Sequence, residues 1–298
     1  MPEKWKAISI SPAAKHWLET SEFGYVLHVF EPVVNLANDQ AKVLSIATRR
    51  VGNGPFCMLV EEQGFPDYID TGSQIGALKD LVQIGDLQID YGDAELWDPH
   101  PVWPNLADDA ARRDWTRDHV HALLKQHADP ESFAQLIIAP AHADQPWATI
   151  LKAAEEPVAE LLVAIAAQDP ASLQTAASHL AGLGPGLTPA GDDFLVGAMH
   201  GLYSTKESLK ALTLCLNIAD AAIPRTNSLS AAWLEVAARG EAGEPWHELL
   251  SAVQDQDERA LEAAVLRILP TGHTSGADAL GGFLAVLDGA ERSLGAAA

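Results

Sequence analysis

Short apolar runs separated by turn-forming residues fill the first third of the chain. The runs 25–30 (YVLHVF), 42–48 (KVLSIAT) and 56–60 (FCMLV) are rich in β-branched and aromatic residues, which is typical of strands. Turn residues interrupt them at Gly24, 35–39, 52–55 and 64–66, and weaker strand candidates follow at 87–89 and 95–97. The pattern predicts a small antiparallel sheet or barrel over roughly residues 20–100.

The apolar spacing becomes helical after Leu106, with Trp115, Val120 and Leu124 among the residues that recur at helical intervals,. The pair Asp169 and Pro170 is a helix start, and Pro157 is expected to begin a new helix inside an Ala/Leu-rich run. Helices are predicted over 108–126, 150–166, 170–180, 189–203, 204–221, 231–239, 244–253, 258–269 and 275–292.

These patterns predict an α+β protein with two domains. The first, residues 1–105, is rich in β-structure and ends in a proline-rich linker at 98–105 (DPHPVWPN). The second, residues 106–298, is larger and all-helical. Because Pro101 and Pro104 disfavour helix in the residues before them, the linker is expected to separate the two patterns.

The charge balance narrows the possible partners. The chain has 298 residues, with 41 Asp and Glu against 19 Lys and Arg, and such an acidic surface repels nucleic acid and anionic membranes. A small anion remains possible, because a site can be locally positive. Cys57 and Cys215 lie in apolar runs and form neither a metal pattern nor a disulfide framework,. No secretory leader or membrane span is apparent, so we expect a cytoplasmic protein.

The most distinctive stretch is 182–197 (GLGPGLTPAGDDFLVG). Its first ten residues hold four glycines and two prolines, and an apolar run follows. Glycine permits backbone angles that other residues avoid, and Thr188 and Pro189 suit the N-cap and first position of a helix. The free N–H groups of a helix start bind anions. The stretch is therefore either a ligand-binding loop or an elaborate helix cap between two packed helices.

A second passage resembles the first. When Asp193 is set against Asp278, Gly191 falls on Gly276, Gly197 on Gly282 and Thr188 on His273. Each passage reads as helix, glycine turn and apolar helix. The match is either chance in an Ala/Gly-rich chain or an internal duplication. A duplication predicts two helix starts that face one another across a pseudo-two-fold axis and converge on one cavity.

Three acids lie near these helix starts. Asp192, Asp193 and Asp278 either stabilise the helix dipole or serve a ligand. Ser275 and Asp278 fit the S-x-x-D capping pattern, which favours the structural reading for Asp278. Capping cannot use both Asp192 and Asp193, so one carboxylate is available for an amide NH₂, a cation or a catalytic water.

Basic and hydroxyl residues accompany the same helix starts. His273 is a candidate general base, since a helix N-terminus favours neutral imidazole. Arg225 can grip a carboxylate or phosphate, although a surface salt bridge is the alternative. We predict catalytic roles for His273, Asp193 and Asp192, and substrate binding by Gly184, Gly186, Thr188, Arg225, Thr226, Asn227, Ser228, Thr274, Ser275 and Asp278. No metal-binding or cofactor motif is present, and no cofactor is expected.

Three segments resemble the AllH family. They are GLGPGLTPAGDDFLVG at 182–197, the run TNSLSAAWLEVAARG at 226–240 and GHTSGADALGG at 272–282. The resemblance is strong in the helical half and loose in the first third. It implies a subunit of the oxamate carbamoyltransferase of allantoin degradation, a branch of purine catabolism. That multi-subunit enzyme interconverts oxalurate and phosphate with oxamate and carbamoyl phosphate.

The implied ligands are small anions that carry amides, which suits the site predicted from the residues. The hypothesis is that N–H donors at 184–188 stabilise a tetrahedral oxyanion. Arg225 then binds phosphate or carboxylate, His273 moves a proton, and Asp192 or Asp193 holds the amide nitrogen. Two alternatives remain at this point: a non-catalytic scaffold or regulatory subunit, and a stand-alone binder of a ureido or phosphate ligand.

Overall fold

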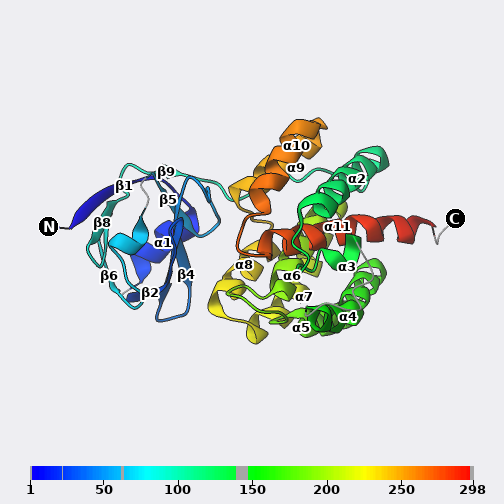
Figure 1. Ribbon diagram of the computed structural model, residues 1–298, viewed down its shortest axis with the longest axis horizontal. Helices are drawn as coiled ribbons and strands as arrows, with labels where there is room; N and C mark the ends of the chain where they lie inside the picture. Colours follow the sequence, from blue (N-terminus) through cyan, green and yellow to red (C-terminus); the bar gives the residue numbers. More distant parts are fainter. Residues whose placement is uncertain (1, 22, 62–63, 139–146, 296–298) are drawn as a thin grey trace. The chain divides into compact units, whose positions relative to one another are not determined.

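The computed structural model describes residues 2–21, 23–61, 64–138 and 147–295. The chain divides into two compact units, one of residues 1–100 with 242–244 and one of residues 101–241 with 245–298 (Figure 1). The first unit holds the β-structure and the second holds the long helices. Together they give the α+β fold that the sequence predicts.

The β-strands of the first unit form one barrel-like sheet. They are β1 (Glu3–Ile10), β2 (Gly24–Val29), β3 (Val33–Asn38), β4 (Val43–Thr48), β5 (Cys57–Val60), β6 (Gln74–Leu78), β7 (Leu81–Ile84), β8 (Leu87–Asp90) and β9 (Glu95–Leu96). Among the described residues the strand order is β5-β4-β3-β2-β6-β7-β8-β1-β9, and pairing of β5 with β1 closes eight of these strands into a ring. Helix α1 (Pro12–Thr20) and the short helix η1 (Phe65–Asp67) complete the unit.

The sheet is mixed, where the sequence pattern indicated an antiparallel one. The pairs β1–β8, β1–β9 and β4–β5 are parallel. The apolar pattern did not predict β1, α1, β6 or β7. Residues 35–39, predicted as a turn, lie mostly within β3. Asn35 is tolerated inside β3 because its Oδ1 accepts a hydrogen bond of 2.7 Å from the Ser45 hydroxyl of the neighbouring strand. This partner satisfies a polar group that would otherwise favour a turn.

The helices of the second unit follow the predicted order. They are α2 (Ala110–His127), α3 (Gln135–Ile138), α4 (Ala148–Ala167), α5 (Pro170–Leu180), α6 (Ala190–Thr205), α7 (Ser208–Ala222), η2 (Ile223–Arg225), α8 (Ser228–Ala238), α9 (Glu244–Asp255), α10 (Glu258–Ile268) and α11 (Ser275–Gly295). The expected new helix at Pro157 is wrong, because α4 runs through it without a break. Leu151, Val158 and Leu161 are buried along one face of α4, and this packing outweighs the proline penalty.

Helices α6 and α11 pack against each other near the centre of the second unit (Figure 1). Their glycines allow backbone to meet backbone. A Cβ atom on Gly197 would lie 1.7 Å from the carbonyl oxygen of Ala279, and a Cβ on Gly282 would lie 2.0 Å from that of Phe194. In the predicted alignment of the two passages, Ala279 corresponds to Phe194. The contacts are therefore reciprocal, as a pseudo-two-fold relation requires.

The segments before α6 and α11 repeat the same design. Asp169 and Asp257 cap α5 and α10 through their side chains, and the residue before each cap is a glutamine with a φ of 53°. A Cβ on Gly191 would lie 2.0 Å from the carbonyl oxygen of Leu180, and a Cβ on Gly276 would lie 2.0 Å from that of Ile268. The internal repeat is thus present in the backbone structure as well as in the amino-acid sequence.

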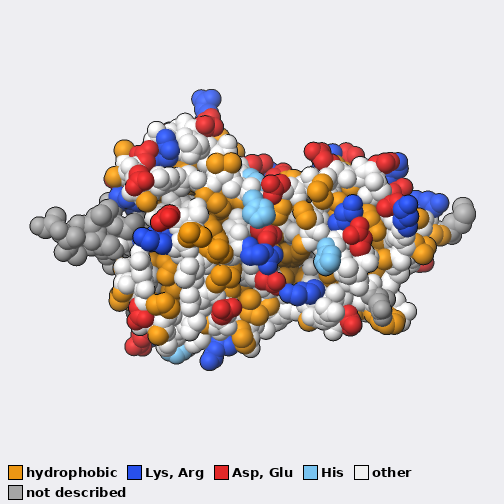
Figure 2. Space-filling model, turned by 180° about the vertical axis from the view of Figure 1, so that it is seen from behind, with side chains coloured by type: hydrophobic (Ala, Val, Ile, Leu, Met, Phe, Trp, Pro, Cys, Tyr) orange, Lys and Arg blue, Asp and Glu red, His pale blue; other side chains and the backbone are white. Residues whose placement is uncertain are grey.

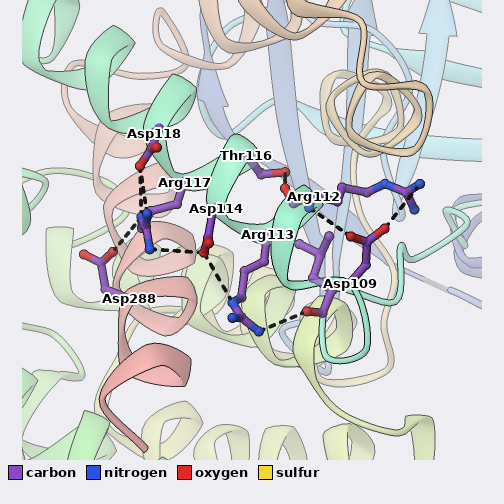
Figure 3. A network of polar contacts seen from close by, with 9 residues as sticks. Asp109, Arg112, Arg113, Asp114, Thr116, Arg117, Asp118 and Asp288 are labelled. Atoms are coloured by element: carbon purple, nitrogen blue, oxygen red, sulfur yellow. Dashed lines mark hydrogen bonds and ion pairs between the residues drawn. The ribbon is translucent and has the colours of Figure 1, made fainter. Parts of the chain in front are cut away.

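Helix α2 carries a chain of arginines that are paired with acids (Figure 3). Asp109 caps the helix by accepting from Arg112 N at 3.0 Å. Arg117 contacts Asp114 at 3.3 Å, Asp118 at 3.0 Å and Asp288 of α11 at 3.9 Å. These contacts neutralise the basic side chain of Arg117 and link α2 to α11.

Candidate functional site

The starts of α6 and α11 meet through their hydroxyl residues. Thr188 Oγ1 lies 2.9 Å from Ser275 Oγ in a hydrogen bond between the two repeats. The predicted N-cap role of Thr188 is wrong, because Pro189 occupies the N-cap position, and among the described residues no side-chain hydrogen bond caps α6. The Thr188 hydroxyl is instead used between helices, so two positive helix ends lie next to each other.

The glycine loop before α6 follows a path that requires glycine. Gly182, Gly184 and Gly186 have φ angles of 73°, 105° and 112°, which side chains rarely adopt. In the described part of the chain, the N–H groups of Gly184, Gly186 and Thr188 donate no hydrogen bond to protein. They are available as donors to an anion, as the sequence predicts for a ligand-binding loop.

Asp192 holds this loop to the rest of the site. Its carboxylate accepts from Gly182 N at 2.9 Å and from the Thr226 hydroxyl. Only 1% of the residue is exposed, and burial raises the pKa of Asp192 while these hydrogen bonds lower it,. Since both oxygens have partners within the protein, Asp192 acts on the loop and on the segment before α8.

Asp193 lies between the two helix starts. The residue is 8% exposed, and its Oδ2 is buried without a hydrogen-bond partner in the described structure. Burial raises its pKa well above the ordinary value, and the negative charge of Asp278 raises it further. Hydrogen bonds from the hydroxyls of Ser275 and Thr188 act in the opposite direction,.

Among the described residues, the carboxylate of Asp278 makes no capping hydrogen bond to α11. Its Oδ1 accepts a hydrogen bond of 2.6 Å from Phe133 N, and its Oδ2 is buried without a partner among the described residues. Gly281 permits this contact, because a Cβ there would lie 2.8 Å from Ala134 Cα. Burial raises the pKa of Asp278 to about 7,.

The start of α8 supplies a third side of the site. Asn227 caps the helix by accepting from Leu229 N and Ser230 N, and its Nδ2 donates to Leu187 O at 2.7 Å. The contact joins α8 to the glycine loop. Ser228 is the first residue of α8. Within the TNS run at 226–228, Asn227 therefore holds the glycine loop through Leu187, and Thr226 donates to the carboxylate of Asp192.

Arg225 is exposed, and the ion pairs of the described residues do not include it. Its backbone is near the glycine loop, since a Cβ on Gly182 would lie 2.9 Å from Arg225 O. The arginines of α2, in contrast, form ion pairs with acids. The guanidinium is thus available to an anion beside the loop.

His273 lies at the outer edge of the second loop. Its side chain is 76% exposed, and its Nε2 is 4.0 Å from Asp129 Oδ2. Thr274 lies beside it, and a hydrogen bond from the Thr274 hydroxyl lowers the pKa of Asp278. The structure therefore gathers the acids and hydroxyls at the junction, and leaves the imidazole in solvent.

Two contributors were missed by sequence reasoning. Phe133 takes part through its backbone N–H, for which no sequence signal exists. Asp129 acts on Asp278 through its charge, although only the turn-like DPES run at 129–132 marks it in the sequence. Both enter the site through tertiary packing of the segment before α3 against α11.

The arrangement suits a small anion that carries an amide. Donors come from the glycine loop and Arg225, and acceptors come from buried carboxylates beneath half-buried hydroxyls. On the face in Figure 2, basic and acidic side chains are interspersed. The described residues contain no cluster of three or more His, Cys, Asp or Glu side chains able to hold a metal ion.

Comparison with protein families assigns both parts of the chain. The family model described as oxamate carbamoyltransferase subunit AllH matches residues 180–287, and the AllH family N-terminal domain matches residues 6–96. The chain belongs to the AllH family. The AllH match begins just before Gly182 and ends within α11, so it contains both helix starts. Curated proteins and solved structures give no match.

No helix in the described residues of this AllH family member is long and apolar enough to cross a bilayer.

Proposed function

We propose that this chain is a subunit of an oxamate carbamoyltransferase, and that the α6 and α11 starts form its ligand site. The reaction interconverts oxalurate and phosphate with oxamate and carbamoyl phosphate, in the breakdown of allantoin. The observation that carries the proposal is the coincidence of the AllH match, residues 180–287, with the site built from the two repeats.

The N–H groups of the glycine loop are assigned to the oxyanion. Transfer of a carbamoyl group passes through a tetrahedral intermediate, and fixed donors stabilise its negative oxygen. Gly184, Gly186 and Thr188 offer such donors at the positive end of α6. Arg225 beside this loop binds the phosphate or the oxamate carboxylate through its planar fork.

The role proposed for each side chain depends on whether the ligand can reach it. Asp192 fixes the loop, because both of its oxygens already accept hydrogen bonds. Asp193, Thr188 and Ser275 face the junction of the helix starts. His273 in solvent exchanges protons with the ligand from the outer side,.

The proposed partners are a small anionic substrate and the other subunits of the enzyme. Leu187 at the tip of the glycine loop is 42% exposed, and Arg225 and His273 are exposed as well. An open site of this kind leaves the reacting groups in water, which weakens electrostatic stabilisation. A partner subunit that covers the loop would exclude that water.

The test is reconstitution of the enzyme with its other subunits, followed by measurement of carbamoyl phosphate formed from oxalurate and phosphate. Arg225→Ala is expected to lower kcat/KM by about 10- to 100-fold, the value of one charge-assisted contact. Arg259→Ala is the matched control, because Arg259 is also exposed and the described ion pairs do not include it. Equal activity of the two variants would exclude a ligand role for Arg225.

Calorimetry of the full chain without partners provides a second test. Binding of carbamoyl phosphate, oxamate or inorganic phosphate, weakened by Arg225→Ala and unaffected by Arg259→Ala, supports a ligand site on this subunit. Absence of binding both alone and in the assembled enzyme would leave a scaffold role for this chain.

A further inference from the structure

Two buried carboxylates at the junction of the repeats each have one oxygen without a hydrogen-bond partner among the described residues. They belong to Asp193 and Asp278, which are 8% and 0% exposed, and the unpartnered atom is Oδ2 in both. Buried ionised oxygens without donors are costly, whereas a protonated carboxyl removes the charge. The first repeat and the second repeat contribute one acid each, at matching positions.

The packing of α6 against α11 brings these two acids close enough to interact electrostatically. Reciprocal glycine contacts at Gly197 and Gly282 bring the helix backbones together, and the Thr188–Ser275 hydrogen bond closes the junction at the helix starts. Two carboxylates in one low-dielectric site cannot both ionise cheaply.

We propose that Asp193 and Asp278 form a proton-holding pair that keeps at least one proton at neutral pH. The pair exchanges this proton with a ligand through the hydroxyl groups of Thr188 and Ser275. This inference rests on the proposed function for the identity of the ligand, but the existence of the pair does not depend on it.

The hydroxyls provide the path from the buried pair to the ligand. Thr188 and Ser275 are half-buried and bond to each other at 2.9 Å, and both hydroxyls act to lower the pKa of Asp193. A hydroxyl both donates and accepts, so it can pass a proton on while receiving another. Asp193 and Asp278 are positioning residues in this scheme, because the hydroxyls lie between them and the ligand.

Two other acids act on the pair, and two exposed basic residues lie on the neighbouring segments. Asp192 on α6 raises the pKa of Asp193, and Asp129 before α3 raises that of Asp278. The cationic candidates, Arg225 before α8 and His273 before α11, are exposed. The near charges are therefore acidic, and they favour retention of the proton.

The proton balance suits carbamoyl transfer. A phosphate oxygen forms a bond to the carbamoyl carbon of oxalurate, and the bond from that carbon to the oxamate nitrogen breaks. The nitrogen keeps the bonding electron pair and takes a proton from the hydroxyl path. The phosphate hydroxyl returns a proton to the same path, so the pair ends with as many protons as it had.

Infrared spectroscopy of the full chain tests the pair without any activity. A protonated carboxyl has a C=O stretching band distinct from those of carboxylates and amides. We expect this band at pH 7 in the wild type, and its weakening in both Asp193→Asn and Asp278→Asn. Asp169→Asn is the control, because Asp169 is an exposed helix cap whose pKa is lowered by its hydrogen bonds. Absence of the band from the wild type at pH 7, or its retention in both pair variants, overturns the proposal.

The hydroxyl path is tested with inorganic phosphate as the probe. Phosphate is expected to shift the carboxyl band of the wild type and of Thr175→Val, in which an exposed hydroxyl of α5 is removed. Thr188→Val is expected to abolish the shift. An unshifted band in the wild type, or an equal shift in Thr188→Val, excludes the path. A normal band and shift in a chain that never yields carbamoyl phosphate with its partners would instead contradict the proposed function.

Discussion

The carboxylate of Asp278 accepts a hydrogen bond of 2.6 Å from the backbone N–H of Phe133. The contact joins the first turn of α11 to a segment before α3 that is far away in the sequence. It satisfies one oxygen of a fully buried acid and leaves the other without a partner among the described residues. The stability of this junction is therefore expected to depend on the protonation of Asp278.

Asp278→Asn is expected to stabilise the protein above neutral pH. Burial raises the folded-state pKa of Asp278 to about 7. The contribution of this carboxyl to the free energy of unfolding is therefore fully present below the unfolded pKa, about 3.9, and is lost as pH rises through 7. The asparagine has no charge to bury, and it keeps the Oδ1 acceptor for Phe133. Its gain in unfolding free energy at pH 8 should be roughly 2–4 kcal/mol, as measured by urea denaturation. A variant less stable than the wild type at pH 8 would contradict the raised pKa.

His200→Phe is expected to reduce the sensitivity of the protein to acid. The ring of His200 is buried between those of Trp103 and Trp246, and burial lowers its pKa to about 3. A depressed histidine pKa means that stability is lost as pH falls below the unfolded value, about 6.5. As the pH falls from 6 to 4, the free energy of unfolding of the wild type should decrease, relative to that of the variant, by up to about 1.4 kcal/mol per pH unit.

The readout for His200 is the difference in urea-unfolding free energy between variant and wild type at each pH, since protonation of Asp278 acts in the opposite direction over part of this range. The exposed His179→Phe serves as the control. Parallel pH profiles for His200→Phe and the wild type would show that the buried imidazole carries no such cost.

Gly197→Ala and Gly282→Ala are expected to separate α6 from α11. Each new Cβ would overlap a backbone carbonyl of the other helix, at 1.7 Å and 2.0 Å, and backbone cannot rotate away as a side chain can. The loss should be about 3 kcal/mol or more, measured by thermal or urea unfolding. Gly289→Ala on α11 is the control, because its Cβ would meet its nearest neighbour, Leu162 Cδ2, at 3.9 Å. Equal effects at all three positions would rule out close packing as the reason for these glycines.

Asn227→Asp is expected to loosen the glycine loop while keeping the cap of α8. An aspartate retains the oxygen that accepts from Leu229 N and Ser230 N, but it loses the Nδ2 donor to Leu187 O. Amide hydrogen exchange should rise at 182–188 and change little in α8. Asn227→Ala removes both interactions and should also cost about 1 kcal/mol of stability. Unchanged exchange in the loop of the aspartate variant would show that the Leu187 contact is dispensable.

Local patterns determined the fold class and the position of the repeats. Helix starts at Asp169 and in the TNS run at 226–228 are visible in the sequence because N-cap chemistry involves neighbouring residues. The glycine spacing at 182–197 and 272–282 likewise marked the two turns. The strands β1, β6 and β7 escaped notice, since their pairing partners and burial come from distant parts of the chain.

The chemistry of the site was decided by tertiary structure. Thr188 bonds to Ser275 and leaves the cap position to Pro189, and Asp278 binds Phe133 in place of capping its own helix. A sequence shows which residues can begin a helix, because that depends on a few adjacent bonds. It does not show what lies across from that beginning. The unpartnered Oδ2 atoms of Asp193 and Asp278 arise from the packing of helices that are distant in the sequence. The protonation of these two carboxyl groups follows from burial that only packing creates.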